Sequence, residues 1–332
     1  MNIDLLSAKK GIRFISISND IGLDVILCSY GASIYSIKMD LESMILSPKD
    51  FNLFYHDGKY YGKTVGRIAG RVPDGKLEVN GKTYQLEQNE NTNCLHGGTH
   101  SISFRNWGYQ IETYKEYIEV TFYLTTRKGE AGFNGKAKYN VRYRIPAKRN
   151  CLEIYYDAVC KEDTYFAMTN HAYFNLGMAK TILDHKLCIK ANEVSTMDPN
   201  NFCINGYKPV SNTPFDFKNP KLIRKDIADE ELHNIKWLNG YDHRFHFMEL
   251  PISEAKVSLA GELYRMNIYT DFDAVQVYTD GFSNNDELLD DEYDAIHRGV
   301  ALECSNQYPE FVKKGEHYKH FIRYNFWRKT DE

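Results

Sequence analysis

Five short segments of the chain carry titratable side chains next to small or aromatic residues. They contain imidazole, carboxyl and guanidinium groups, which serve in general acid–base catalysis and in binding polar ligands. Polar residues at strand ends or in loops can converge on one cleft of a folded protein. The segments are 66–71 (GRIAGR), 95–98 (LHGG), 169–176 (TNHAYFNL), 240–243 (GYDH) and 301–303 (ALE).

Each candidate also has a purely structural interpretation when it is taken alone. His171 fits a hydrogen-bonded core histidine, and Glu303 fits a surface charge at a strand end. Arg71 fits a surface cation or the partner of an internal carboxylate. Asp242 fits a turn residue that bonds its own backbone, and Gln276 fits a strand residue that faces solvent.

Nucleotide and metal sites are not predicted. The segment 58–64 (GKYYGKT) has three residues between its glycines, where a P-loop needs four, and no G-x-G-x-x-G motif is present. His96 and His100 are four residues apart, and His243 and His246 three apart, but neither segment has a helical pattern that would place a pair on one face. We therefore expect neither a metal nor a cofactor.

The elements that position these segments are predicted to be strands. Apolar and polar residues alternate, with many β-branched and aromatic side chains, as in half-buried strands. The clearest alternating stretches are 109–125, 137–145, 152–156 and 257–278.

Turn and helix signals are sparse. Segment 77–84 predicts a hairpin with Asn80-Gly81 at its tip, because both residues tolerate positive φ. Two short helices are expected, one over 226–235 and one opening at 47–50. No linker or repeat divides the chain. We predict an all-β protein, a large antiparallel β-sandwich with few short helices, formed by residues 1–332 as a single domain.

Composition narrows the classes of partner and compartment. The 332 residues contain 41 Lys and Arg against 45 Asp and Glu, a net charge of −4, which favours neither nucleic acid nor a membrane surface. Seven cysteines without a C-x-x-C motif indicate neither a disulfide framework nor a zinc ribbon. No signal-peptide pattern or long apolar run occurs, so we expect a cytoplasmic protein. Monomer and homodimer both remain open.

Taken together, the motifs resemble the aldose 1-epimerase (galactose mutarotase) family over about residues 62–327. The resemblance implies the galactose mutarotase-like supersandwich fold and a cofactor-independent isomerase. Such an enzyme interconverts the α and β anomers of a free hexose, such as galactose or glucose. The motifs that carry the resemblance are 95–98 (LHGG), 169–176 (TNHAYFNL), 213–217 (TPFDF), 241–243 (YDH), 275–279 (VQVYT) and 315–318 (GEHY).

The resemblance also implies roles for individual residues. Glu303 would be the general base on the anomeric hydroxyl, and desolvation would raise its basicity. His171 would be the general acid toward the ring oxygen, and a nearby carboxylate would favour its protonated form. His96 would be a second donor beside the ring, with Gly97 and Gly98 permitting close approach of a ligand or loop. Hydrogen bonds to the sugar hydroxyls would come from Arg71, Asp242 and Gln276.

The chain departs from the family pattern at three places. Gly70 stands where Asn is usual, 279–281 (TDG) replaces the usual Thr-Gly-Asn, and the segment after Glu303 is altered. None of these changes removes the acid or the base, but they predict a different preference among hexoses or pentoses.

Three other functions compete with this interpretation. A metal-dependent sugar isomerase of the cupin type would need a compact ligand cluster. A non-catalytic carbohydrate-binding sandwich would not need Glu303 together with His171. A relative acting on phosphorylated sugars would need several cations at the site, and the motif segments offer only Arg67 and Arg71.

Overall fold

The computed structural model describes residues 1–7, 9–229, 239–282 and 296–331, and most of its regular structure is antiparallel sheet. The largest sheet has nine strands in the order β11 (Gly108–Thr113), β12 (Tyr117–Thr126), β13 (Ala137–Pro146), β14 (Cys151–Cys160), β28 (His317–Arg328), β24 (Tyr264–Thr270), β23 (Val257–Ala260), β18 (Lys186–Ile189) and β21 (Lys221–Leu222).

Two further sheets lie on the other side of the core. The six-stranded sheet has the order β17 (Tyr173–Phe174), β26 (Val300–Ser305), β25 (Ala274–Tyr278), β22 (Asp242–Phe247), β19 (Ala191–Met197) and β20 (Ile204–Pro209). The five-stranded sheet consists of β1 (Asn2–Ser7), β2 (Arg13–Ser18), β3 (Leu23–Cys28), β4 (Ser33–Met39) and β5 (Glu42–Ser43).

Small two-stranded sheets and short helices complete the described chain. The strand pairs are β6 (Thr64–Val65) with β16 (Thr169–Asn170), β7 (Arg71–Val72) with β10 (Cys94–Leu95), β8 (Lys76–Val79) with β9 (Lys82–Gln85), and β15 (Thr164–Phe166) with β27 (Glu310–Val312). The helices are α1 (Phe51–His56) and the 3-10 turns Lys9–Gly11, Pro73–Gly75, Ile102–Phe104, Glu130–Gly132, Ile182–Asp184, Ile223–Lys225 and Lys329–Asp331.

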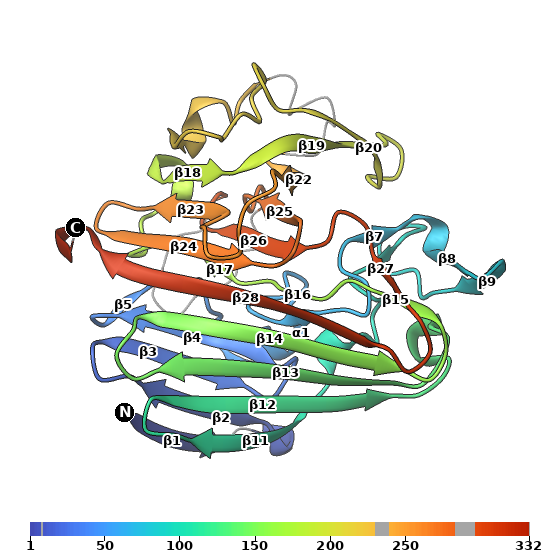
Figure 1. Cartoon of the computed structure of the whole chain (residues 1–332), viewed down its shortest axis with the longest axis horizontal. Coiled ribbons are helices and arrows are strands. Elements are labelled where there is room, and N and C mark those ends of the chain that lie inside the picture. Colours follow the sequence, from blue (N-terminus) through green and yellow to red (C-terminus); the bar gives the residue numbers. More distant parts are fainter. Residues whose placement is uncertain (8, 230–238, 283–295, 332) are drawn as a thin grey trace.

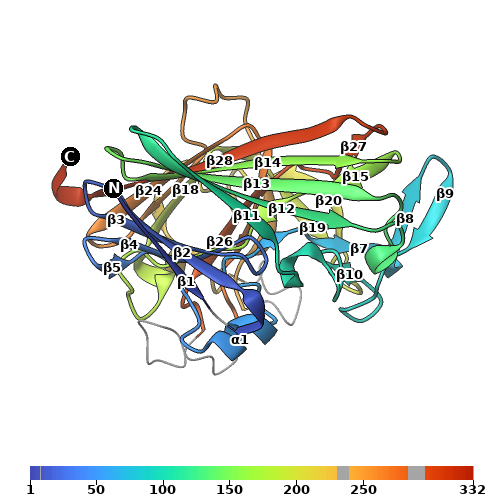
Figure 2. The ribbon, with the colours of Figure 1, turned by 90° about the horizontal axis from the view of Figure 1, so that it is seen from below.

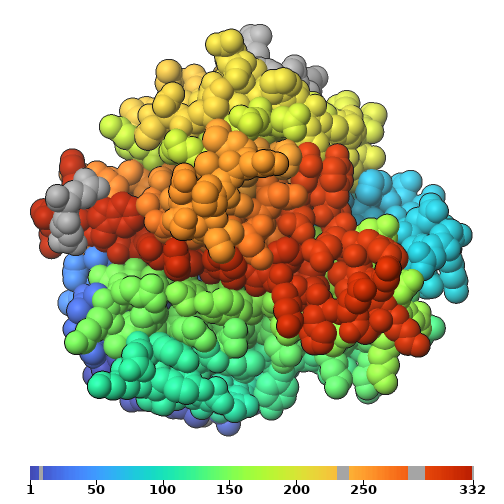
Figure 3. Space-filling model, in the orientation of Figure 1, coloured from blue at the N-terminus to red at the C-terminus, as the bar shows by residue number. Residues whose placement is uncertain are grey.

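The sheets stack as the two faces of a sandwich. Figure 1 looks onto the nine-stranded sheet, and Figure 2 shows β13, β14 and β28 as one layer with the N-terminal sheet below them. A single cluster of buried apolar side chains includes Ile15, Val141 and Val275, one from each large sheet. In Figure 3 the C-terminal segment, in red, crosses the middle of the molecule between green and orange segments. The predicted antiparallel β-sandwich is confirmed.

Residue alternation explains why these strands lie where they do. Along β13, Tyr139, Val141 and Tyr143 are buried, whereas Lys138 and Asn140 between them are exposed. Successive side chains of a strand point to opposite faces, so this pattern buries one face in the core. All four alternating stretches of the sequence form strands, and 257–278 forms three of them.

The turn and helix predictions have different outcomes. Asn80 and Gly81, with φ of 52° and 73°, connect β8 to β9, as predicted for the hairpin. Helix α1 begins after Asp50, whose side chain caps it by accepting from the Asn52 amide, so the helix expected from 47–50 is confirmed. The helix expected over 226–235 falls mostly outside the described residues, and 226–229 contain a turn. None of the described helices has both the length and the apolar character to span a membrane.

Candidate active site

A cavity of about 1020 Å³ opens at one end of the six-stranded sheet. Its volume lies at the upper end of the range that small-molecule sites occupy. All six predicted site residues contribute to its wall. They are Arg71, His96, His171, Asp242, Gln276 and Glu303.

The floor of the cavity is a row of side chains across three neighbouring strands. Glu303 of β26 is paired in register with Gln276 of β25, and Gln276 is paired with Arg244 of β22. Directly paired residues project to the same face of a sheet, so the three side chains stand side by side. Asp242 lies two residues before Arg244 on β22 and shares that face.

His171 reaches Glu303 because its own segment is tied to the same sheet. Strand β17, which follows His171, pairs with β26 so that Tyr173 lies opposite Ala301. The side chain of Asn170 donates to the Gly62 carbonyl and accepts from the Ala172 amide, which fixes the backbone on both sides of His171. The TNH motif therefore positions the His171 imidazole against strand β26.

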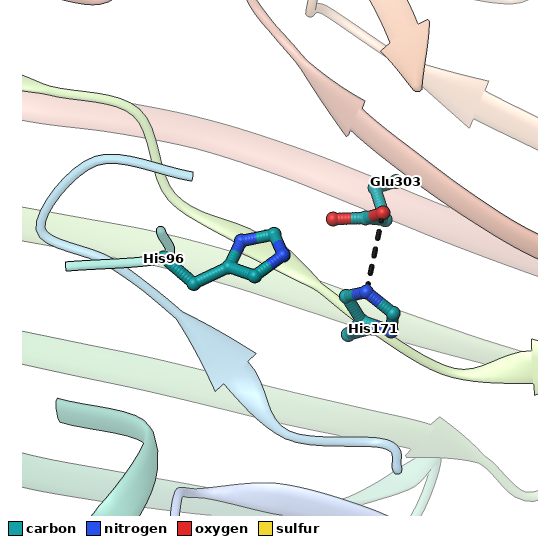
Figure 4. Close-up of side chains that lie close together, drawn as sticks. All are labelled: His96, His171 and Glu303. Carbon is teal, nitrogen blue, oxygen red and sulfur yellow. Dashed lines mark ion pairs between the residues drawn. The ribbon is translucent and has the colours of Figure 1, made fainter. Parts of the chain in front are cut away.

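The imidazole and the carboxyl group are in contact and buried. His171 Nε2 lies 3.3 Å from Glu303 Oε1, and the two side chains are 6% and 5% exposed. Figure 4 shows this contact as a dashed line, with the His96 ring facing the pair. His171 Nδ1 is buried without a hydrogen-bond partner in the described structure. Apart from their contact with each other, the His171 and Glu303 side chains therefore leave most of their hydrogen-bonding atoms without a partner in the described structure.

Burial controls how this pair holds protons. Desolvation, with a smaller contribution from the Asp242 charge, raises the pKa of Glu303 to about 8. Desolvation lowers the pKa of His171 to about 4. The Asp242 carboxylate favours the protonated form of His171, as predicted, but the loss of hydration outweighs this attraction. Near neutral pH the pair holds one proton, and it resides on Glu303.

His96 has a defined tautomer. Its Nδ1 accepts a hydrogen bond from the Gly70 amide at 3.2 Å, and burial lowers its pKa well below the usual value. A neutral ring that accepts at Nδ1 carries its proton at Nε2, which Figure 4 shows on the side toward His171 and Glu303. A Cβ at Gly97 would lie 2.3 Å from the Gly66 carbonyl oxygen, so this glycine permits the close loop contact that the sequence predicted.

The other predicted residues form a connected polar network. Arg71 makes a bidentate contact with Glu90, at 2.6 and 2.8 Å, and its Nη1 lies 3.4 Å from Asp242 Oδ2. Gln276 Nε2 donates to Asp242 Oδ1 at 2.7 Å. Asp242 is therefore not a turn residue, and Gln276 does not face bulk solvent. The network presents fixed donors and acceptors to the cavity.

Comparisons with known proteins agree with this architecture and site. A sequence profile described as aldose 1-epimerase matches residues 13–325. The chain is 30% identical to the aldose 1-epimerase of Escherichia coli over 95% of each chain. It is 28% identical to the galactose mutarotase of Mus musculus over 93% of this chain and 92% of that one. A crystal structure of galactose 1-epimerase from Lactobacillus acidophilus superposes with a TM-score of 0.88 at 26% identity, covering 98% of both chains.

The chain belongs to the aldose 1-epimerase family. Membership makes it an isomerase of the mutarotase class, in agreement with the function that the motifs implied. The resemblance based on the TNHAYFNL and LHGG motifs is thereby confirmed.

Among the described residues of this epimerase, one group has a spacing that could hold a metal. Donor atoms of His96, His171 and Glu303 lie within 4.8 Å of one another. The His96 tautomer opposes ligation, because the nitrogen that faces the group carries a proton while the other accepts from the backbone. His100 is instead an exposed partner of Glu87, and His243 is buried and accepts from the amide of Asp242.

Sequence reasoning missed three residues of the epimerase site. Tyr60 packs against both active-site imidazoles, with ring centroids 4.8 Å from His96 and 5.9 Å from His171. Glu90 lies in a loop without any pattern to mark it. Arg244 could have been found, because it lies two residues beyond Asp242 on an alternating strand and so shares its face.

Of the two cations considered for binding a phosphorylated sugar, Arg67 lies elsewhere. It is buried and donates to the Asn134 carbonyl oxygen and to the hydroxyls of Tyr139 and Thr164. Arg67 therefore stabilises the fold and does not line the cavity. Of the two cations in the motif segments, Arg71 alone contributes to the cavity wall.

Proposed function

We propose that this protein equilibrates the anomers of a free hexose, galactose or glucose, by acid–base ring opening with Glu303 and His171. The observation that carries the proposal is the buried 3.3 Å contact between these side chains in the wall of a cavity large enough for a sugar. A pair that shares one proton can give a proton to one oxygen of a hemiacetal while accepting one from the other.

Ring opening requires the ion-pair form of the Glu303–His171 pair. When the pyranose binds, the shared proton passes from Glu303 to His171 Nε2. The Glu303 carboxylate then takes the proton of the anomeric hydroxyl, and His171 gives its proton to the ring oxygen as the C1–O5 bond breaks. The products are an open-chain aldehyde, a neutral imidazole and a protonated Glu303.

Ring closure begins from this neutral form. Rotation about the C1–C2 bond presents the other face of the aldehyde. His171 accepts the proton of the C5 hydroxyl, O5 attacks C1, and Glu303 protonates the carbonyl oxygen. Each half-reaction regenerates the proton state that the other needs, so no net proton is exchanged with solvent.

The remaining residues orient the sugar. His96 presents an N–H toward the ring oxygen or a neighbouring hydroxyl, in addition to the proton that His171 supplies. Arg71, Asp242 and Gln276 bind hydroxyl groups through the network described above. Holding a substrate in a reactive geometry lowers the barrier by removing the entropy cost of alignment.

The same proposal covers the organisation and location of the protein. Site residues come from β7 through β26, which supports action of residues 1–332 as a single domain, as a monomer or a homodimer. All seven cysteines are buried and unpaired, which supports the reducing cytoplasm as its location. The ligand is a monosaccharide, and neither nucleic acid nor a membrane is involved.

Polarimetry on freshly dissolved α-D-galactose and α-D-glucose tests the proposal. With purified protein and excess chelator, we expect faster decay to the same final rotation as in the blank, and the ratio of the two rates ranks the sugars. A complete loss of activity in chelator that added metal reverses would favour a cupin-type metal isomerase. Absence of acceleration with every aldose tested would favour a non-catalytic sugar-binding protein.

A further inference from the structure

Arg244 is a buried cation in the cavity wall for which sugar ring opening has no use. The residue is 6% exposed, lines the cavity and stands in the floor row next to Gln276. The proposed ring opening assigns no proton transfer or hydroxyl contact to Arg244, whose charge lowers the pKa of Glu303 against the larger effect of burial. A guanidinium group remains charged at every pH at which the protein is folded.

The contacts of Arg244 satisfy only part of its hydrogen-bonding capacity. Nη1 donates to the Gln307 carbonyl oxygen at 3.3 Å, and the Tyr207 hydroxyl contacts the guanidinium and donates to the same oxygen. Nε is buried without a partner. In the described part of the chain, no carboxylate forms an ion pair with Arg244.

The other two long cations of the cavity wall have their charge balanced. Lys59 Nζ lies 2.8 Å from Asp280 Oδ1. Arg71 is paired with Glu90 and Asp242. Arg244 is therefore the cation of the described cavity wall that has no carboxylate in contact with its guanidinium. Burial of a charge without a counter-charge is unfavourable, and a bound anion would remove this cost.

The backbone opposite Arg244 leaves space for the guanidinium. A Cβ at Gly70 would lie 3.0 Å from Arg244 Nη2, and Gly70 has φ of +84°. Any side chain at position 70 would press on the guanidinium. Gly70 thus leaves the space that the Arg244 guanidinium occupies.

We propose that Arg244 binds a carboxylate of the substrate, and that the preferred substrate is a hexuronic acid that undergoes the same ring opening. The inference rests on the proposed function, since it assigns the substrate class of that site. A single arginine without a carboxylate partner suits the single negative charge of a carboxylate, whereas a phosphate group carries nearly two and calls for further cations. Arg244 stands two strands from Glu303, about 10 Å across the sheet, so a sugar with C1 at Glu303 presents its other end to Arg244.

Anomer exchange of four sugars, followed by NMR with blanks subtracted, tests this inference. The sugars are D-galactose, D-glucose, D-galacturonate and D-glucuronate, and D-glucose 6-phosphate is a further probe. For the wild type we expect kcat/KM for the better uronate to exceed that for the corresponding neutral hexose by tenfold or more. Equal values would overturn the inference, and so would a preference for the phosphate. Failure with all five sugars would instead refute the proposed mutarotase function.

Variants of Arg244 test whether this residue causes the preference for the uronate. In Arg244→Gln we expect kcat/KM for the uronate to fall about ten- to hundredfold further than kcat/KM for the neutral hexose. Arg244→Lys should restore part of the uronate rate, because it keeps the charge and loses the planar fork. Arg224→Gln, the same substitution at an exposed arginine paired with Asp184, is the matched control and should change neither rate. An equal fall for both classes of sugar in Arg244→Gln would mean that Arg244 only supports the fold or binds hydroxyls.

A binding measurement tests the same contact without turnover. Methyl glycosides cannot open, so methyl β-D-glucuronide and methyl β-D-glucoside act only as competitors of galactose turnover. We expect the glucuronide to inhibit at least tenfold more strongly in the wild type and to lose this advantage in Arg244→Gln. Equal inhibition in the wild type would contradict the inference.

Discussion

Two buried ionisable pairs of this protein have opposite surroundings. Lys63 and Asp57 form an ion pair whose side chains are at most 1% exposed, and Lys63 also donates to the Phe54 carbonyl and lies 4.0 Å above the Phe54 ring. Asp57 accepts from the Tyr61 amide. His171 and Glu303 are buried to a similar extent, but they contact each other beside a cavity, with one nitrogen left unpaired.

The structural pair and the reactive pair differ in whether their hydrogen-bonding atoms are available to a substrate. Burial raises the pKa of Asp57 and lowers that of Lys63, and each charge opposes the shift of the other. The hydrogen bonds of that pair are used within the protein, so its proton has no other acceptor. Burial also shifts the pKa values of the His171–Glu303 pair, and this pair has unused hydrogen-bonding capacity, which is the condition for proton transfer to a substrate.

Removal of the carboxylate from the reactive pair is expected to have the largest effect. Glu303→Gln keeps the shape and loses the proton acceptor, so kcat should fall about 10²- to 10⁴-fold, with sugar affinity within threefold of wild type. Polarimetry gives the rate, and titration calorimetry gives the affinity. A near-wild-type rate would remove Glu303 from its proposed role.

His171→Gln tests the other residue of the reactive pair. It should lower kcat far more than it changes KM. An effect confined to KM would mean that His171 only binds the sugar.

Disruption of the structural pair should reduce stability while turnover is largely retained. Lys63→Met leaves Asp57 buried without a counter-charge, so the free energy of unfolding should fall by about 3–5 kcal/mol. Urea denaturation measures this loss. The double variant Lys63→Met/Asp57→Leu should recover much of the stability, because it removes both charges. Full stability of the single variant would contradict the contrast between the two pairs.

The pH profile tests the proton count of the reactive pair. Below about pH 4 His171 is also protonated, so no base remains, and above about pH 8 Glu303 has lost its proton, so no acid remains. We expect kcat/KM to be flat between these limits and to fall tenfold per pH unit beyond each of them. A single transition in kcat/KM near pH 6.5 would show that a histidine with an unperturbed pKa controls the rate.

The smallest effect is expected within the sugar-binding network. Gln276→Ala removes the 2.7 Å hydrogen bond to Asp242, a loss of about 0.5–1.5 kcal/mol. Steady-state kinetics should show KM raised a few-fold and kcat within twofold of wild type. A larger fall in kcat than in affinity would place Gln276 in the reactive pair rather than in the binding network.

The sequence predicted the strands well and their arrangement into sheets poorly. The alternation of apolar and polar residues in 109–125 and 137–145 involves residues close together in the sequence, so it can be recognised without knowledge of the fold. The pairing of β14 with β28 joins residues such as Leu152 and Tyr324, which no local pattern connects. For the same reason, no local pattern indicated the row formed by Glu303, Gln276 and Arg244.

The candidate site shows the same division between local and non-local signals. The family motifs identified all six predicted residues that line the cavity. The desolvation that lowers the pKa of His171 was not foreseen, because it depends on burial by residues distant in sequence. The departure at Gly70 was visible in the sequence, but its relation to Arg244 required the fold.

The position of β28 has a consequence for synthesis of the chain. This 12-residue strand lies between β14 and β24, inside the nine-stranded sheet, although both neighbours precede it in the sequence. Until β28 has been synthesised, the edges of β14 and β24 have no partner, and unpaired edges invite association with other chains. We therefore expect a product truncated before residue 317 to aggregate rather than to form a weakened enzyme.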